Sequence, residues 1–453
     1  MFESLKSWRR PLMLTLFLDL DPAHDRSNVA KAIGEFEKYL KASADPVMER
    51  IHFFRIFIMP GSKQGKDRIA FSVVFDGEKI DFLNQLVAGL RTALIPVIKN
   101  VVGFNRLSSK PSDTDLAQWI LSHDHQPAAY HVGSVWNSLK GINEDREVYL
   151  AISEFLDQPS DLAQQKPQEI KSRVEAMLTS RWPNIQTDGQ QKVRFGFELL
   201  RILDLLLFLF AVFLIPALPT ILIVVVMGWA LTNFFWLVPV VAIAIVLATV
   251  ALVRYLERVE EDVEMWPEDG HVSDVVSGET VEGQNQMTLF VDVKDSFARR
   301  TILWTVLWIA GAVSRHWYRR GKLVGIDTIH FARFFLLDGK TKMVFMSDYD
   351  GSWSRYLLDF TGPGSLAVVP IWSSLLGCPK ARFLRWPEVG FDERFLPFTR
   401  CCQLKTQCWF SNYPKLPVCE IKRNEKIRDG LFKPSTDQEI LDWLALFNGG
   451  ANV

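Results

Sequence analysis

The feature that most constrains this chain is an apolar run in its middle. Leu205 to Val253 is 49 residues long and contains no Asp, Glu, Lys or Arg, although charged residues make up 23% of the whole chain. One membrane-spanning helix needs about 20 apolar residues, so the run predicts a hairpin of two transmembrane helices, near 205–227 and 231–253. Two alternatives stay open: a re-entrant hairpin broken at Pro216 and Pro219, or a helical hairpin buried in a large soluble core.

The residues that flank the run predict its orientation. Arg194 and Arg201 precede it, Arg254 and Arg258 follow it, and the turn between the two helices carries no charge. Because basic flanks favour the cytoplasmic side, both halves of the chain are expected in the cytoplasm, held beside a lipid bilayer. The formal net charge of −1 gives no sign of a nucleic-acid partner.

The two halves of the chain repeat one pattern. Ile51–Phe57 reads IHFFRIF and Ile329–Phe335 reads IHFARFF, so both match I-H-F-x-R-x-F. In each copy a glycine-containing turn, a second strand and an Asp-Gly pair follow, and the Asp-Gly opens a helix with apolar periodicity. The same order of features, found twice, indicates an internal duplication.

Each copy also has an earlier strand and helix. Strands are expected at 12–20 and 286–293, and a last strand is expected near 101–107 and near 381–386. The predicted fold class is therefore α+β, with two tandem ferredoxin-like β-α-β-β-α-β units and the transmembrane hairpin inserted between them. The expected divisions are a first unit at 1–108, a helical connector at 109–200, the hairpin at 201–256, an acidic linker at 257–285, a second unit at 286–390 and a C-terminal tail at 391–453.

Two apolar stretches of the second unit point to a possible ligand. Ile302–Val313 is apolar almost all round, and Ser365–Leu376 has a similar character. Such a helix is normally buried, and neither stretch is long enough to span a membrane. The interpretations are plain burial between a sheet and its neighbours, docking on a bilayer through Trp304 and Trp308, or an apolar ligand site that both stretches line and that faces the membrane.

The candidate chemical residues lie on the repeated strand and at the end of the next one. Asp350 and Arg333 could meet across the hairpin of strands, either as a buried structural pair or as an acid–base group with a charge-stabilising partner. Because side chains alternate along a strand, His330 and Arg333 would face opposite ways on a regular strand. His123, His125 and His131 could form a metal cluster, with surface polarity as the alternative.

The first copy keeps the equivalent residues His52, Arg55 and Asp76. Its strand end reads Val73-Val74-Phe75, however, where the second copy has Ser347-Asp348-Tyr349. The richer set of polar groups favours the second copy as the functional one.

Tandem ferredoxin-like units with an Asp-Gly at a strand end resemble the dimeric α+β barrel superfamily, which includes dye-decolourising peroxidases and chlorite-dismutase-like haem proteins. The strand-end motif of the peroxidases is G-x-x-D-G, and the present chain departs from it at Ser347, where the motif has its first Gly. The resemblance implies haem as cofactor, Asp350 as the distal acid, Arg333 as its partner, and His316 or His330 as a candidate iron ligand.

Two functions are therefore expected from the sequence. One is a membrane-anchored, peroxidase-like oxidoreductase that acts on an apolar or lipid-derived substrate. The other is a non-catalytic, membrane-bound module that binds a lipid or a partner. Small residues in the apolar run, such as Ala244 and Ala248, also allow close helix packing and hence a homo-oligomer through the hairpin.

Overall fold

The structure of this chain, a computed structural model, describes most of the 453 residues. Described are residues 11–447 except 62–65, 105–106, 108–110, 135–137, 159–164, 186–201, 211–236, 282, 317–325, 363–364 and 384–390. These residues form an α+β protein with two four-stranded antiparallel sheets.

The predicted order strand, helix, strand, strand, helix is present in both halves. In the first half it consists of β1 (Leu12–Asp19), α2 (Arg26–Ala42), β2 (Ile51–Met59), β3 (Arg68–Phe75) and α3 (Lys79–Ile98). In the second half it consists of β5 (Gln284–Asp292), α10 (Phe297–His316), β6 (Ile329–Leu337), β7 (Lys342–Asp350) and α11 (Trp353–Thr361).

The remaining elements join or cover these two motifs. They are η1 (Pro46–Arg50), α4 (Asp113–Ser122), β4 (Ala129–Val132), α5 (Leu139–Leu156), α6 (Pro167–Arg181), α8 (Leu237–Val259), α9 (Asp269–Val276), η4 (Asp338–Lys340), α12 (Ser365–Trp372), α13 (Phe391–Cys402), β8 (Thr406–Ser411), α14 (Val418–Gly430) and α15 (Asp437–Ala445).

Local sequence explains why the helices begin where they do. Asp25 caps α2 by accepting a hydrogen bond from the Ser27 backbone, and Ser112 forms a capping box with Asp115 at the start of α4. Each cap satisfies a backbone N–H that has no partner inside its helix.

The fourth strand of each sheet comes from the other half of the chain. The strand orders are β1-β3-β2-β8 and β4-β6-β7-β5, so β8 pairs with β2 of the first half and β4 pairs with β6 of the second. The last strands predicted near 101–107 and 381–386 are absent from the described residues of both segments, while 105–106 and 384–386 lie outside the described residues. In the first of these segments Val101 makes only an isolated bridge to Leu20, and in the second half the matching bridge joins Val293 to Leu375.

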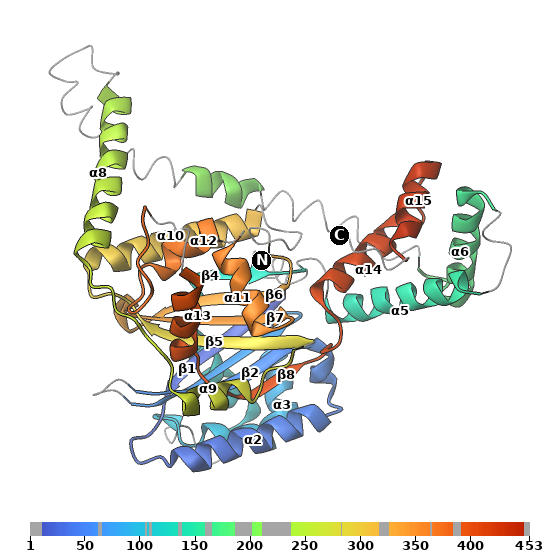
Figure 1. The fold of residues 1–453 in the computed structure, drawn as a ribbon. Coiled ribbons are helices and arrows are strands. Elements are labelled where there is room, and N and C mark those ends of the chain that lie inside the picture. Colours follow the sequence, from blue (N-terminus) through green and yellow to red (C-terminus); the bar gives the residue numbers. More distant parts are fainter. Residues whose placement is uncertain are drawn as a thin grey trace, which may run out of the picture.

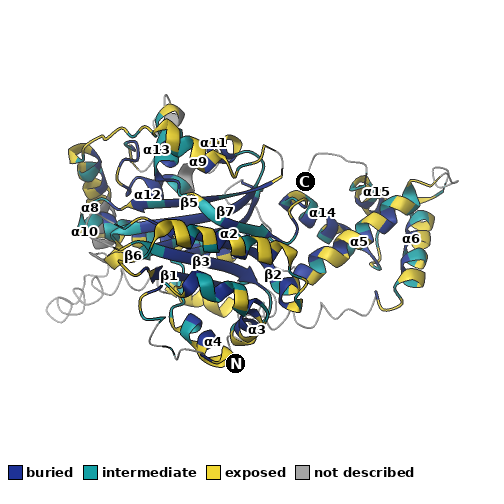
Figure 2. Cartoon of the chain, turned by 90° about the horizontal axis from the view of Figure 1, so that it is seen from below, coloured by how far each residue is buried: buried dark blue, intermediate teal, exposed yellow. Residues whose placement is uncertain are grey.

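The two sheets lie face to face, and helices cover their outer faces. Helices α2 and α3 lie on one side of the stacked sheets and α10, α11, α12 and α13 on the other (Figure 1). The strands are largely buried, while α2 and α3 turn an exposed face outward (Figure 2). The molecule thus has three apolar layers, one under each helical cover and one between the sheets.

A helical arm leaves the body beyond the ends of the strands. It consists of α5, α6, α14 and α15, with a separate core that includes Ile152, Val174, Leu178, Ile427 and Trp443 (Figure 1). Helix α5 follows β4 and helix α14 follows β8, so the exchanged strands carry the two inner helices of the arm.

The transmembrane hairpin predicted at 201–256 needs correction. Across the described residues, no helix is long and apolar enough to cross a membrane, and this finding overturns both the hairpin and the membrane localisation inferred from it. Helix α8 runs on from the apolar segment into the charged flank, and its end packs on the body. There Val253 and Glu257 are buried, and Glu257 accepts a hydrogen bond from the Phe383 backbone. Residues 211–236, with the expected turn between the two passes, lie outside the described residues.

Candidate functional site

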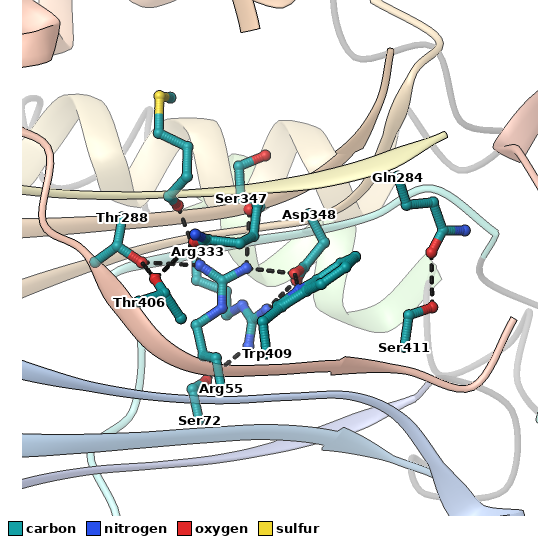
Figure 3. Close-up of polar contacts among 12 residues, drawn as sticks. Arg55, Ser72, Gln284, Thr288, Arg333, Ser347, Asp348, Thr406, Trp409 and Ser411 are labelled. Atoms are coloured by element: carbon teal, nitrogen blue, oxygen red, sulfur yellow. Dashed lines mark hydrogen bonds and ion pairs between the residues drawn. The ribbon is translucent and has the colours of Figure 1, made fainter. Parts of the chain in front are cut away.

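A buried polar cluster joins the two sheets at the centre of the layer between them. Arg55 of β2 and Arg333 of β6 both bind the carboxylate of Asp348 on β7, one at each oxygen (Figure 3). Trp409 of β8 donates to the same carboxylate over 3.1 Å. The exposed fraction of each arginine and of Asp348 is 1% or less.

Further hydrogen bonds hold each guanidinium group against the opposite sheet. Arg55 donates to the Ser347 carbonyl at 2.8 Å and to Thr288 Oγ1 at 3.0 Å, both in the second sheet. Arg333 donates to Ser72 Oγ in the first sheet at 2.6 Å. The cluster therefore fixes how the two halves sit on one another.

The charges of this cluster do not cancel, since two arginines share one carboxylate. Burial alone would raise the pKa of Asp348, but Arg55 and Arg333 hold it below its ordinary value. Desolvation lowers the pKa of Arg55 to about 10, which still leaves the group charged at neutral pH. Because all three charged side chains are almost completely buried, the cluster has the character of a structural ion pair rather than of a substrate site.

The two repeated histidines make a second, symmetric polar feature. His52 Nε2 lies 3.0 Å from Asp76 Oδ1, and His330 Nε2 lies 2.8 Å from Asp350 Oδ1. The register of each strand pair shifts at the histidine, between Ile51 and Phe53 in one copy and at the equivalent place in the other. Such a bulge re-aims a side chain. It turns each imidazole toward the layer between the sheets, where the His330 ring lies 5.3 Å from that of Phe53.

The other oxygen of each aspartate holds one helix of the arm. Asp76 Oδ2 accepts a hydrogen bond from the Leu139 N–H at the start of α5 over 2.6 Å, and Asp350 Oδ2 accepts one from Val418 at the start of α14 over 2.7 Å. A carboxylate at a helix N-terminus is stabilised by the exposed N–H groups and by the helix dipole. The repeated His and Asp residues thus attach the arm to the body.

The predicted site residues fall into three places. His330 and Asp350 are hydrogen-bonded to each other, whereas Arg333 binds Asp348 and not Asp350. His316 lies at the end of α10 with its Nε2 3.0 Å from Asp204. A haem needs an imidazole nitrogen that faces an open cavity, but the Nε2 atoms of both His330 and His316 face carboxylates. Neither Nε2 atom is therefore offered to an iron, and no comparison tests the haem prediction.

An apolar cavity of ≈ 70 Å³ lies elsewhere, between the outer face of the second sheet and its helical cover. The helices that close it are α10 and α12, the two apolar stretches that the sequence pointed to. Its walls include Ala310 of α10, Ala332 of β6, Phe345 of β7, Phe360 of α11 and both Ile371 and Trp372 of α12.

One polar pair stands in the wall of this cavity. His131 of β4 and Ser314 of α10 line it together, and His131 Nδ1 lies 2.9 Å from Ser314 Oγ. Both side chains are buried. His131 therefore belongs to a cavity wall, and in the described part of the chain no three His, Cys, Asp or Glu residues gather as a metal site.

Sequence reasoning missed Asp348, Ser314 and the role of His131. Asp348 carried a signal, because alternation places it on the same face of β7 as Met346 and so toward the other sheet. No local sequence signal indicated the position of His131, because β4 is four residues long and its partner strand lies about 200 residues further on.

Comparison of this chain with protein-family models, with curated protein sequences and with solved structures finds no match. The resemblance to the dimeric α+β barrel superfamily accordingly stays a prediction.

Proposed function

We propose that this protein binds a small apolar molecule in the cavity between its second sheet and helices α10 and α12. The observation that carries the proposal is the cavity itself, closed by side chains such as Phe345, Phe360 and Trp372. Ligand sites are typically concave and apolar with a few placed polar groups, and here those groups are His131 and Ser314.

The size of the cavity limits the ligand. One buried water needs about 10–15 Å³ of cavity volume, so the ≈ 70 Å³ of this cavity corresponds to about five to seven waters. That is the space of one six-membered ring with a small substituent, or of the end of a longer chain. A haem is far larger, so this cavity does not offer it a place.

The repeat suggests why the cavity occurs in the second half. The pattern I-H-F-x-R-x-F has two variable positions: the first is Phe54 in one copy and Ala332 in the other, and the second is Ile56 and Phe334. Phe54 belongs to the core under α2 and α3, and Ala332 lines the cavity under α10. The smaller side chain of Ala332 leaves room for a ligand beside Phe334, which also lines the cavity.

The experiment is a titration of the purified full chain with toluene, in which isothermal titration calorimetry measures the binding. We expect saturable binding that Ala332→Phe abolishes, because the added ring fills the space. Ala298→Phe, the same exchange in the first turn of α10 and outside the cavity wall, is the control and should leave binding intact. Absence of toluene binding to the unaltered protein would refute the proposal.

A further inference from the structure

We infer that the ligand carries a single uncharged hydroxyl group, which binds at Ser314. This inference rests on the proposed function, because it concerns the polar end of the same cavity. Its starting point is that His131 and Ser314 form the hydrogen-bonded pair in a wall that is otherwise made mainly of aliphatic and aromatic side chains.

The hydrogen-bonding capacity of Ser314 is only partly used. A serine hydroxyl has one donor and two acceptor sites. Among the described residues, Ser314 Oγ makes one hydrogen bond, to His131, while its residue is only 6% exposed. A buried hydroxyl that faces a cavity favours a ligand that completes its hydrogen bonds.

A ligand hydroxyl matches this pair whichever way the shared proton points. If Ser314 donates to His131, the serine oxygen can accept a hydrogen bond from the ligand. If His131 donates, the serine proton is free to be given to the ligand. A ligand hydroxyl can take either role, whereas an ether or ketone oxygen can only accept.

A charged head group fits this wall poorly. No Asp, Glu, Lys or Arg lies among the described residues that line the cavity. Burying an ionised carboxylate without a cationic partner costs far more than burying a hydroxyl that keeps a hydrogen bond. Ser314 sits in the last turn of α10, where the backbone carbonyl end of the helix dipole also disfavours an anion. The ligand class is therefore a small apolar alcohol or phenol.

The test compares three ring compounds of similar size on the full chain: toluene, phenol and benzoate. One net neutral hydrogen bond corresponds to roughly a two- to tenfold difference in affinity, so phenol should bind tighter than toluene by about that factor. Benzoate should bind more weakly than either. Ser314→Ala should erase the preference for phenol and leave toluene binding in place, while Thr301→Ala, on the exposed face of α10, should change neither.

The outcomes separate this inference from the proposed function. Toluene binding without a phenol preference, or a phenol preference that survives Ser314→Ala, would overturn the hydroxyl inference and leave the cavity as a binding site. Tighter binding of benzoate than of phenol would also overturn it. If the unaltered protein bound none of the three compounds, both proposals would be refuted.

Discussion

The outer faces of the two sheets differ although the two halves repeat the same elements. Under α2 and α3 the first sheet packs closely, with a residual space of ≈ 20 Å³ lined by side chains such as Phe36, Phe54 and Phe71. Under α10 and α12 the second sheet leaves ≈ 70 Å³. The same arrangement of strands and helices therefore encloses a filled core in one half and a candidate binding site in the other.

The inner faces of the two sheets, in contrast, depend on each other. Arg55 and Arg333 occupy the same position of the repeat, yet one carboxylate, Asp348, serves both. Its counterpart in the first half is Val74. The outer faces are thus separate for each half, while the layer between the sheets is completed by residues from both halves.

The largest effect is expected from Asp348→Val, which gives the second copy the residue of the first. The change leaves two buried arginines without their carboxylate, and breaking a buried pair costs about 3–5 kcal/mol. Chemical denaturation should show a loss of at least this size in the free energy of unfolding.

The double variant Asp348→Val with Val74→Asp is the matched control for that experiment. It moves the carboxylate to the equivalent position of β3, in the same layer between the sheets as the two arginines. Recovery of most of the lost stability would support the shared layer, and no recovery would show that the halves are not equivalent there.

A second comparison concerns the arm, where α5 carries Asp145 at the place that Asn424 occupies in α14. Asp145 is buried with Arg428 only at 4.0 Å, and its desolvation raises its pKa to about 7. A group whose pKa is higher in the folded state stabilises that state when protonated. The stability from Asp145 is therefore fully present below about pH 4 and is lost as the pH rises toward 7.

The change that tests this is Asp145→Asn, which makes α5 match α14. In the unaltered protein the stability of the arm should fall by up to about 1.4 kcal/mol per pH unit between pH 4 and pH 7. Hydrogen exchange of α5 and α14 measures it. In the variant, the stability of the arm should change less with pH over this range. An unchanged pH dependence would show that another group is responsible.

The smallest effects are expected at the two aspartates that hold the arm. Asp76→Ala and Asp350→Ala each remove one helix cap, which costs about 0.5–2 kcal/mol. Because each aspartate binds a histidine and a helix N-terminus in the same way, thermal unfolding should register similar losses for both. A large loss for Asp350 alone would indicate a special role for the second copy.

Much of the fold followed from local sequence patterns. The repeat I-H-F-x-R-x-F with its Asp-Gly predicted the order strand, helix, strand, strand, helix in both halves, and this order is observed. The apolar character of Ile302–Val313 and Ser365–Leu376 predicted a ligand site that both line and that faces a membrane. Helices α10 and α12 do line a common cavity, but it lies between them and the second sheet.

The rest depended on contacts between distant segments. The exchange of β4 and β8 is a choice of partner made across the whole chain, and neither short strand encodes it locally. The bulge at His330 broke the alternation from which its direction had been predicted, and Arg333 found Asp348 rather than Asp350 because its partner was set by the packing of the two sheets. The apolar run at Leu205–Val253 was judged by its composition alone.

The most direct measurement of the central claim is a crystal structure of the protein under xenon pressure. Xenon enters dry apolar cavities without needing a hydrogen bond. We expect xenon density beside Ala332, under α10 and α12, and none beside Phe54 in the first half. Density at both positions, or at neither, would contradict the claim that the second half alone keeps its outer face open to a ligand.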